Sequence, residues 1–198
     1  PSGNSVMTFL LHKTERMPTL LHTYPFQKRN SYNYPALARA GVHITYDRQQ
    51  IRPIGNIARP LHVFNRFDTR VAILKLFPGI TEEVVAAILN IPDLRGVVLE
   101  TFGAGNAPSH EWLYERLRAA VERGVVIVNK TQCNTGSVSM GQYAVSLNLL
   151  KAGVISGYDI TTEALLTKMM HVLGEYGEDL VKVKKMLSVS LCGELTNV

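Results

Sequence analysis

Three apolar runs, each followed by a helical pattern, constrain the fold of this 198-residue chain more than any other feature. The runs are Val71–Phe77, Gly96–Phe102 and Val125–Asn129, and they are apolar along their length rather than alternating. Strands of that kind are buried on both faces, which is typical of a parallel sheet whose connections are helices. The sequence therefore predicts an α/β fold, with a parallel sheet and helices on both faces.

The helices between these strands have recognisable ends. Thr81 is expected to cap the first with its hydroxyl, and Ser109 the second, which Gly124 ends. A third helix is expected to run to about Lys151 and to end at Gly153. The residues expected on the buried helix faces are Val84, Val85, Ile88, Leu89, Leu113, Leu117, Ala120 and Val121.

The last part of the chain is predicted to be helical. Thr161 or Thr162 is the expected cap of a helix with a broad apolar stripe, and a shorter amphipathic helix follows around Leu180–Leu187. Such a stripe indicates core packing rather than a ligand site. The stripe consists of Leu165, Leu166, Met169, Met170 and Leu173.

The helix and strand patterns weaken toward the start of the chain. Residues 42–46 alternate like a half-exposed strand, and residues 1–34 show neither the helical nor the strand period.

The net charge of +5 is unevenly distributed. Residues 1–30 hold four basic residues against one acid, so the other 168 residues carry only +2, with the signs interspersed. Nucleic-acid binding requires basic residues gathered on one face, so this distribution argues against it.

Two cysteines without a CxxC pair, and no signal-peptide pattern, favour a cytosolic protein. No apolar run approaches the roughly 18 residues needed to cross a membrane.

Function in a parallel sheet is expected at the carboxyl ends of its strands, here in the loops Pro78–Thr81, Gly103–Ser109 and Lys130–Ser139. The turn that begins at Gly103 lies where a dinucleotide fingerprint would, but Pro108 replaces the third glycine and no acid ends the next strand. No Gly-Lys-Ser/Thr sequence for a phosphate loop occurs. The turn is therefore either purely structural or the edge of a binding site.

The sequence offers residues for a hydrolase triad and for a metal site, but not the surrounding pattern that either site needs. Ser139, Asp159 and His171 stand in the order of an α/β-hydrolase triad, but residue 137 is not the glycine that a nucleophile elbow needs. We expect His171 to be packed within a helix. The histidines and cysteines lack metal-ligand spacing, so neither a metal nor a cofactor is predicted. The residues leave Cys133 open as either a small buried thiol or a ligand contact.

Three segments in register resemble a known family. They are Gly96–Pro108, Asn129–Cys133 and Ala152–Ala164, and they look like the C-terminal domain of the cytosolic, animal-like type I L-asparaginases. The likeness runs from about Asn33 to Glu194. It implies a Rossmann-like fold and, for the complete enzyme, hydrolysis of asparagine to aspartate and ammonia by a threonine nucleophile without metal or cofactor.

The resemblance also implies what this chain lacks. In the family the nucleophilic and activating groups lie in an N-terminal domain, in TGGT and HGTD motifs, and neither motif occurs in these 198 residues. No catalytic residue is therefore assigned, and the chain alone is expected to be inactive. The expected partners are L-asparagine, the N-terminal asparaginase domain and, in the full-length protein, further subunits of a homodimer or homotetramer. The C-terminal domain is expected to close the cleft and to hold subunits together.

Two sets of site residues follow from the resemblance. Gly103, Gly105 and Asn106 match the Gly-x-Gly-Asn turn of the family, which implies contact with the substrate or with a neighbouring subunit's active site. Cys133 matches a Thr-Gln-Cys motif beside the regulatory asparagine site of bacterial members, which carry arginine where this chain has Glu100. Glu100 and Cys133 are thus the candidate regulatory site.

The resemblance divides the chain into three parts. Residues 71–198 form the C-terminal α/β domain, residues 31–70 are the end of the linker and the start of that domain, and residues 1–30 resemble nothing in the family. A coding sequence read in the wrong frame, or an alternative exon, would explain the first part. Two alternatives to an asparaginase fragment stay open: a non-catalytic asparagine-binding or oligomerisation module, and a truncated product that folds poorly.

Overall fold

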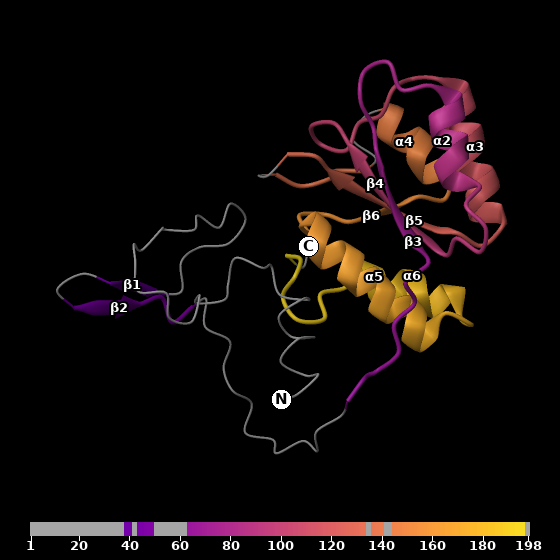
Figure 1. Cartoon of the computed structure of the whole chain (residues 1–198). Coiled ribbons are helices and arrows are strands. Elements are labelled where there is room, and N and C mark those ends of the chain that lie inside the picture. Colours follow the sequence, from indigo (N-terminus) through magenta and orange to yellow (C-terminus); the bar gives the residue numbers. More distant parts are fainter. Residues whose placement is uncertain (1–37, 41–42, 50–62, 134–135, 141–143, 197–198) are drawn as a thin grey trace, which may run out of the picture.

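The computed structural model describes residues 38–40, 43–49, 63–133, 136–140 and 144–196. The predictions on residues 1–30 lie outside this part of the chain. A small antiparallel hairpin pairs β1 (Ala38–Ala40) with β2 (Ile44–Tyr46), apart from the main body (Figure 1). The side chains of β2 are all exposed, with Ile44 59% and Tyr46 62% exposed, so the alternating burial predicted there is wrong.

The main body is built on one parallel sheet, as predicted. Its four strands follow the order β3-β4-β5-β6, and every neighbouring pair is parallel. The last strand is only two residues long and was not predicted, because a two-residue strand leaves no periodic signal. The strands are β3 (Val71–Lys75), β4 (Gly96–Thr101), β5 (Val126–Thr131) and β6 (Ile155–Ser156).

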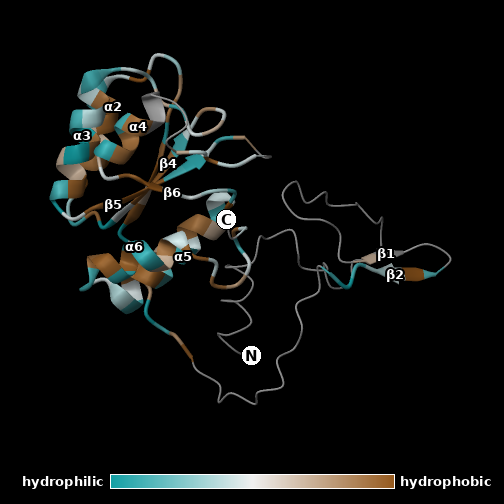
Figure 2. Cartoon of the chain, turned by 180° about the vertical axis from the view of Figure 1, so that it is seen from behind, coloured by the Kyte–Doolittle hydropathy of each residue, from teal (hydrophilic) through white to brown (hydrophobic). Residues whose placement is uncertain are grey.

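Helices cover the sheet on both faces, which confirms the predicted layers (Figure 1). One face carries three helices and the other carries the two C-terminal ones, and each face has its own apolar core. Hydrophilic residues lie on the outer sides of the helices and hydrophobic ones toward the sheet (Figure 2). The first group is α2 (Glu82–Leu89), α3 (Glu111–Glu122) and α4 (Ala144–Lys151); the second is α5 (Thr162–Tyr176) and α6 (Leu180–Ser188).

Strands β4 and β5 are buried at every residue, as a central parallel pair requires. Side chains two residues apart point to the same face, so Leu99 and Ile127 pack under α2–α4, whereas Val98 and Val128 pack under α5. This alternation continues to the carboxyl ends of the strands. The alternation therefore determines toward which face of the sheet each polar side chain at these strand ends points.

The helices differ from the prediction in three details, two at their ends and one on a face. Thr81 occupies the cap position of α2, but its hydroxyl makes no bond to a backbone N–H. The cap of α3 is His110 rather than Ser109, so the helix begins one residue later. The His110 ring stacks on that of Trp112, with 5.6 Å between ring centroids. Val84, expected on the buried face of α2, is 41% exposed. Thr161 caps α5 and accepts from the N–H of Ala164, as expected.

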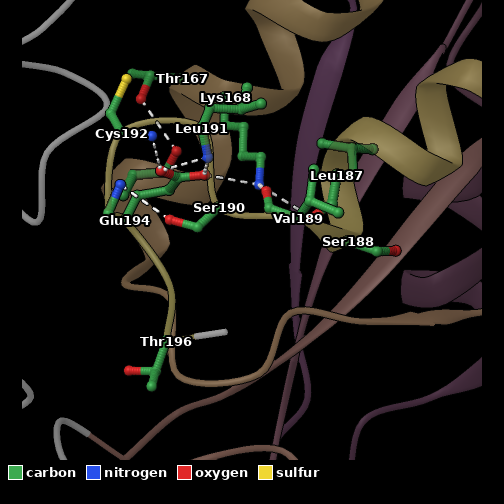
Figure 3. Close-up of polar contacts among 12 residues, drawn as sticks. Thr167, Lys168, Leu187, Ser188, Val189, Ser190, Leu191, Cys192, Glu194 and Thr196 are labelled. Carbon is green, nitrogen blue, oxygen red and sulfur yellow. Dashed lines mark hydrogen bonds and ion pairs between the residues drawn. The ribbon is translucent and has the colours of Figure 1, made fainter. Parts of the chain in front are cut away.

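A buried ion pair fastens the C-terminal segment to α5. The Lys168 ammonium lies 2.8 Å from a Glu194 carboxylate oxygen, and both side chains are completely buried. The same ammonium donates to the carbonyl oxygens of Leu187 and Val189 at the end of α6 (Figure 3). Glu194 accepts from the N–H groups of Leu191 and Cys192. We call Lys168, Glu194 and these backbone partners the C-terminal clasp.

The segment before β3, residues 63–70, forms an extended strap along α5. The Asp68 N–H donates to the carbonyl oxygen of Met170, and the Arg66 N–H donates to the Glu175 carboxylate. His171 is buried under the strap, where its ring centroid lies 5.3 Å from that of Phe64 and 6.0 Å from that of Phe67. The prediction of a packed His171 is confirmed.

His171 makes stability depend on pH. Burial lowers its pKa below the ordinary value of about 6.5, although nearby Glu175 opposes that shift. Below pH 6.5 the unfolded chain therefore binds a proton that the folded chain does not, and the free energy of unfolding falls until the pH reaches the folded pKa. Urea unfolding at pH 7.5 and 5.5 should show this fall, and His171→Phe should reduce it. An equal fall in the variant would contradict the assignment.

Candidate functional site

The predicted functional loops lie together at one edge of the sheet. Strands β3, β4 and β5 are parallel and in register, so their carboxyl ends meet there. Gln132 links the loops, because its side-chain amide donates to the carbonyl oxygens of Leu76 and Glu100. The alternation along the strands gives this edge two sides, one toward α2–α4 and one toward α5.

The first side holds the Gly-x-Gly-Asn turn. Asn129, completely buried at the end of β5, donates from its side-chain amide to the Gly105 carbonyl oxygen at 3.1 Å. Its Oδ1 accepts from the Thr101 hydroxyl at 2.6 Å. The Thr131 hydroxyl donates to the carbonyl oxygen of Gly103. Two side chains of β5 therefore hold the backbone of the turn that follows β4.

The glycines of this turn have a conformational role. Gly103 and Gly105 have φ of +50° and +101°, in the left-handed region that disfavours other residues. A Cβ on Gly105 would also lie 2.7 Å from Cγ1 of Val138, in the loop after β5. The sequence predicted a tight turn here, and the structure adds the reason why the second glycine has no room for a side chain.

Asn106 carries an unsatisfied atom. Its backbone pairs with Phe102 in both directions, which closes the turn. The side-chain Oδ1 is buried, and no hydrogen-bond partner reaches it from the described part of the chain. A buried carbonyl oxygen without a donor costs free energy, and such atoms in native structures commonly await water, a ligand or a partner.

The second side carries three charged residues in a line across the sheet. Lys75, Glu100 and Lys130 are register partners on β3, β4 and β5, so their side chains share the face toward α5. Glu100 is buried, and its Oε1 accepts from the Thr162 hydroxyl in the first turn of α5. The Lys75 ammonium lies 3.7 Å from the other carboxylate oxygen. We call Lys75, Glu100 and Lys130 the charged row.

Cys133 is exposed, and its N–H donates to the Thr131 hydroxyl at 3.0 Å. Of the two alternatives that the residues left open, the small buried thiol is therefore wrong. Glu100 and Cys133 belong to adjacent strand ends, and no hydrogen bond or ion pair joins their side chains in the described residues. These residues also contain no group of three or more His, Cys, Asp or Glu side chains placed to hold a metal ion.

Sequence reasoning missed the buried polar residues that support the loops. Asn129, Lys130 and Thr131 were read as the end of a strand and the start of a loop, but β5 continues through Thr131. A signal was present, since three polar residues directly follow four apolar ones. Thr162 was predicted only as a helix cap, and its bond to Glu100 depends on tertiary packing.

A groove of about 890 Å³ lies at the opposite edge of the sheet, where the strands begin. It is lined by the strap, by Arg95 and by the turn between α5 and α6. Its charges are largely paired internally, because Arg70 binds Asp68 and Arg95 donates to the Gly177 carbonyl oxygen. No predicted site residue lines this groove.

No helix in the described residues is long and apolar enough to span a membrane.

Comparison with known proteins gives consistent matches. The Glutaminase/Asparaginase C-terminal domain family matches residues 70–187. Human 60 kDa lysophospholipase is 44% identical over 166 residues, covering 84% of this chain and 28% of its own length. L-asparaginase 1 of Escherichia coli strain K12 is 35% identical over 195 residues, covering 98% of this chain and 56% of its own. That alignment extends into residues 1–30, whose origin stays a prediction.

Solved structures agree with the sequence matches. L-asparaginase I from Vibrio cholerae superposes with a TM-score of 0.77 at 37% identity, covering 85% of this chain and 50% of its own. The thermostable L-asparaginase from Thermococcus kodakarensis has a TM-score of 0.74 at 34% identity. The chain thus spans about half the length, or less, of the relatives it matches. With the fold and the family match in agreement, the chain belongs to the Glutaminase/Asparaginase C-terminal domain family.

Proposed function

We propose that this chain is the C-terminal part of a cytosolic type I L-asparaginase and that it acts in amide hydrolysis only together with an N-terminal catalytic domain. The family match and the L-asparaginase relatives support the reaction class. The absence of TGGT and HGTD motifs from these 198 residues supports the missing catalytic half. In the assembled enzyme this part closes the cleft over L-asparagine and contributes to a homodimer or homotetramer.

The observation that carries the proposal is the Gly-x-Gly-Asn turn, which ends in a buried acceptor. Two strand-end side chains, Asn129 and Thr131, hold the turn, and Asn106 Oδ1 has no donor in the described residues. A donor from the N-terminal domain, from a neighbouring subunit or from the substrate would satisfy this oxygen. Asn106 is therefore the residue through which this domain reaches the active site.

Ammonia release from L-asparagine tests the proposal. The purified chain should show no turnover, since removing a catalytic nucleophile alone typically costs several orders of magnitude. The chain mixed with the N-terminal half of a type I L-asparaginase should recover activity. In that mixture Asn106→Ala should lower kcat/KM at least tenfold, whereas Asn90→Ala, at the exposed end of α2, should not. Enzyme-like rates from the chain alone would contradict the proposal.

A second candidate is a non-catalytic asparagine-binding module. The buried Glu100 carboxylate beside the exposed Cys133 loop favours it, and these two residues remain our candidate regulatory site. Saturable asparagine binding without turnover, in the presence of the N-terminal half, would select this candidate over the first. Because one relative is named a lysophospholipase, the same mixture should also be assayed for release of fatty acid from a lysophospholipid.

A further inference from the structure

His171 is a buried titratable group with an unsatisfied ring nitrogen. It is only 5% exposed, and its Nδ1 has no hydrogen-bond partner among the described residues. The rings of Phe64 and Phe67, both on the strap, lie against it. An imidazolium carries an N–H on both ring nitrogens, so protonation would place a buried N–H at Nδ1 without an acceptor. The charged form is therefore compatible with this packing only if an acceptor moves in or the strap moves away.

Glu175 is the carboxylate that can bind an imidazolium at position 171. It lies four residues later on α5, the spacing at which side chains of one helix meet. The other charged groups on the strap, on this part of α5 and just beyond its end are either engaged elsewhere or exposed. They are Asp68 with Arg70, Lys168 with Glu194, Arg95 with the Gly177 carbonyl oxygen, Asp179 with the Lys182 N–H, and the exposed Arg66 and Glu178.

Glu175 also holds the strap. Its Oε1 accepts from the Arg66 N–H at 3.1 Å. An imidazolium at position 171 competes with that N–H for the same carboxylate, and a charged ring is also poorly placed between Phe64 and Phe67. One proton on His171 therefore weakens both contacts that hold the first part of the strap on α5.

The strap has a fixed end and a free side. The Asp68 N–H donates to the carbonyl oxygen of Met170, and the Arg70 carbonyl oxygen accepts from two backbone N–H groups at the start of β4. These bonds do not involve His171. Residues 65–67 form part of the wall of the 890 Å³ groove, which gives them space to move.

We propose that the strap is a pH-sensitive latch, in which protonation of His171 draws Glu175 away from the strap and releases residues 63–67 from α5. Residues 68–70 stay attached and act as the hinge. Residues 31–70 are the predicted linker to the N-terminal half, so the released strap loosens the attachment of that linker. This consequence rests on the proposed function, whereas the release itself does not.

Hydrogen exchange of the full chain, followed by nuclear magnetic resonance, tests the release. An imidazole with a pKa of about 6.5 gains most of a proton between pH 7.5 and 5.5, whereas burial lowers the pKa of the closed form, which gains less. The opening constant at the Arg66 amide, corrected for the intrinsic exchange rate, should therefore rise by up to about tenfold. Contacts between the His171 and Phe64 rings should weaken in parallel, while the Asp68 amide stays protected.

Three variants make the test specific. His171→Phe keeps a ring but binds no proton, so its Arg66 amide should show no rise. Glu175→Gln can still accept the Arg66 N–H but offers an imidazolium no charge, so the rise should be smaller. His110→Gln removes an exposed histidine from the start of α3 and should behave like the unaltered chain. Protection of the Leu99 amide, in β4, verifies that each variant is folded.

Two outcomes would show the latch to be wrong. One is a rise of less than about twofold in the unaltered chain, or an equal rise in His171→Phe. The other is a loss of protection at Asp68 together with Arg66, which indicates general destabilisation rather than motion about a hinge. Neither outcome bears on the asparaginase assignment, because ammonia release from the mixed halves tests that assignment separately.

Discussion

Lys168→Met is expected to lower the free energy of unfolding by about 3–5 kcal/mol, the usual cost of removing one partner from a buried ion pair. The substitution keeps a long apolar side chain but leaves the Glu194 carboxylate buried without its cation. It also leaves the carbonyl oxygens of Leu187 and Val189 without their donor (Figure 3). Urea unfolding followed by circular dichroism at pH 7 measures the loss.

Two companion variants make this test specific to the ion pair. Lys185→Met removes an exposed lysine from α6 and should change stability by less than about 0.5 kcal/mol. The double variant with Lys168→Met and Glu194→Gln should be more stable than Lys168→Met alone, because no uncompensated charge is then buried. A Lys168→Met chain as stable as Lys185→Met would show that the C-terminal clasp contributes nothing.

The clasp also predicts a response to acid. Burial raises the pKa of Glu194, but Lys168 and the N–H groups of Leu191 and Cys192 outweigh it, so the folded pKa lies below the ordinary value. Stability from this group is therefore complete above the unfolded pKa and is lost as the pH falls through the folded one. The double variant should lose less stability than the unaltered chain below about pH 4.5.

Gly174→Ala is the second substitution with a large expected effect. Alanine is the better helix former by about 1 kcal/mol, so propensity alone predicts stabilisation of α5. The strap prevents it, because a Cβ at position 174 would lie 2.5 Å from the carbonyl oxygen of Arg66 and 2.8 Å from Cα of Phe67. Both are backbone atoms, so they cannot rotate away from the Cβ as the end of a flexible side chain could. We expect a net loss of about 1–3 kcal/mol, measured by urea unfolding.

The pKa of His171 shows whether a clash between position 174 and the strap causes this loss of stability. If the strap moves away from α5, Phe64 and Phe67 no longer cover His171, and the histidine titrates nearer its ordinary pKa. Gly79→Ala is the control, since its φ of +85° carries a backbone cost but no atom lies within 4 Å of a Cβ there. It should lose about 1 kcal/mol with no change at His171. A Gly174→Ala chain more stable than the unaltered one would contradict the close approach.

Much of the fold could be predicted because its signals are local. Apolar runs such as Val126–Val128, bounded by turn residues, favour strands buried on both faces, and Gly124 and Gly153 mark helix ends by their left-handed backbone. The same reasoning predicts function at the strand ends. It failed on strand β6 and on the start of α3, where the deciding contacts are tertiary.

The candidate site was predictable in its loops but not in its supports. The Gly-x-Gly turn is visible in the sequence because glycine reports its own backbone conformation. Nothing local indicates that Asn129 would hold that turn from the next strand, or that Thr162 would reach Glu100 across 62 positions. Such bonds depend on strand order and register, which apolar periodicity does not encode.

The sequence by itself determined the three longer strands of the parallel sheet and most helices, because each depends on the spacing of apolar residues and on turn chemistry. The tertiary structure decided which polar residues are buried together. It paired Lys168 with Glu194, laid the strap on Gly174 and aligned Lys75, Glu100 and Lys130 in one row. The physical reason is that these charges acquire their partners only when the chain brings distant segments within a few ångströms, where loss of water makes the pairing matter.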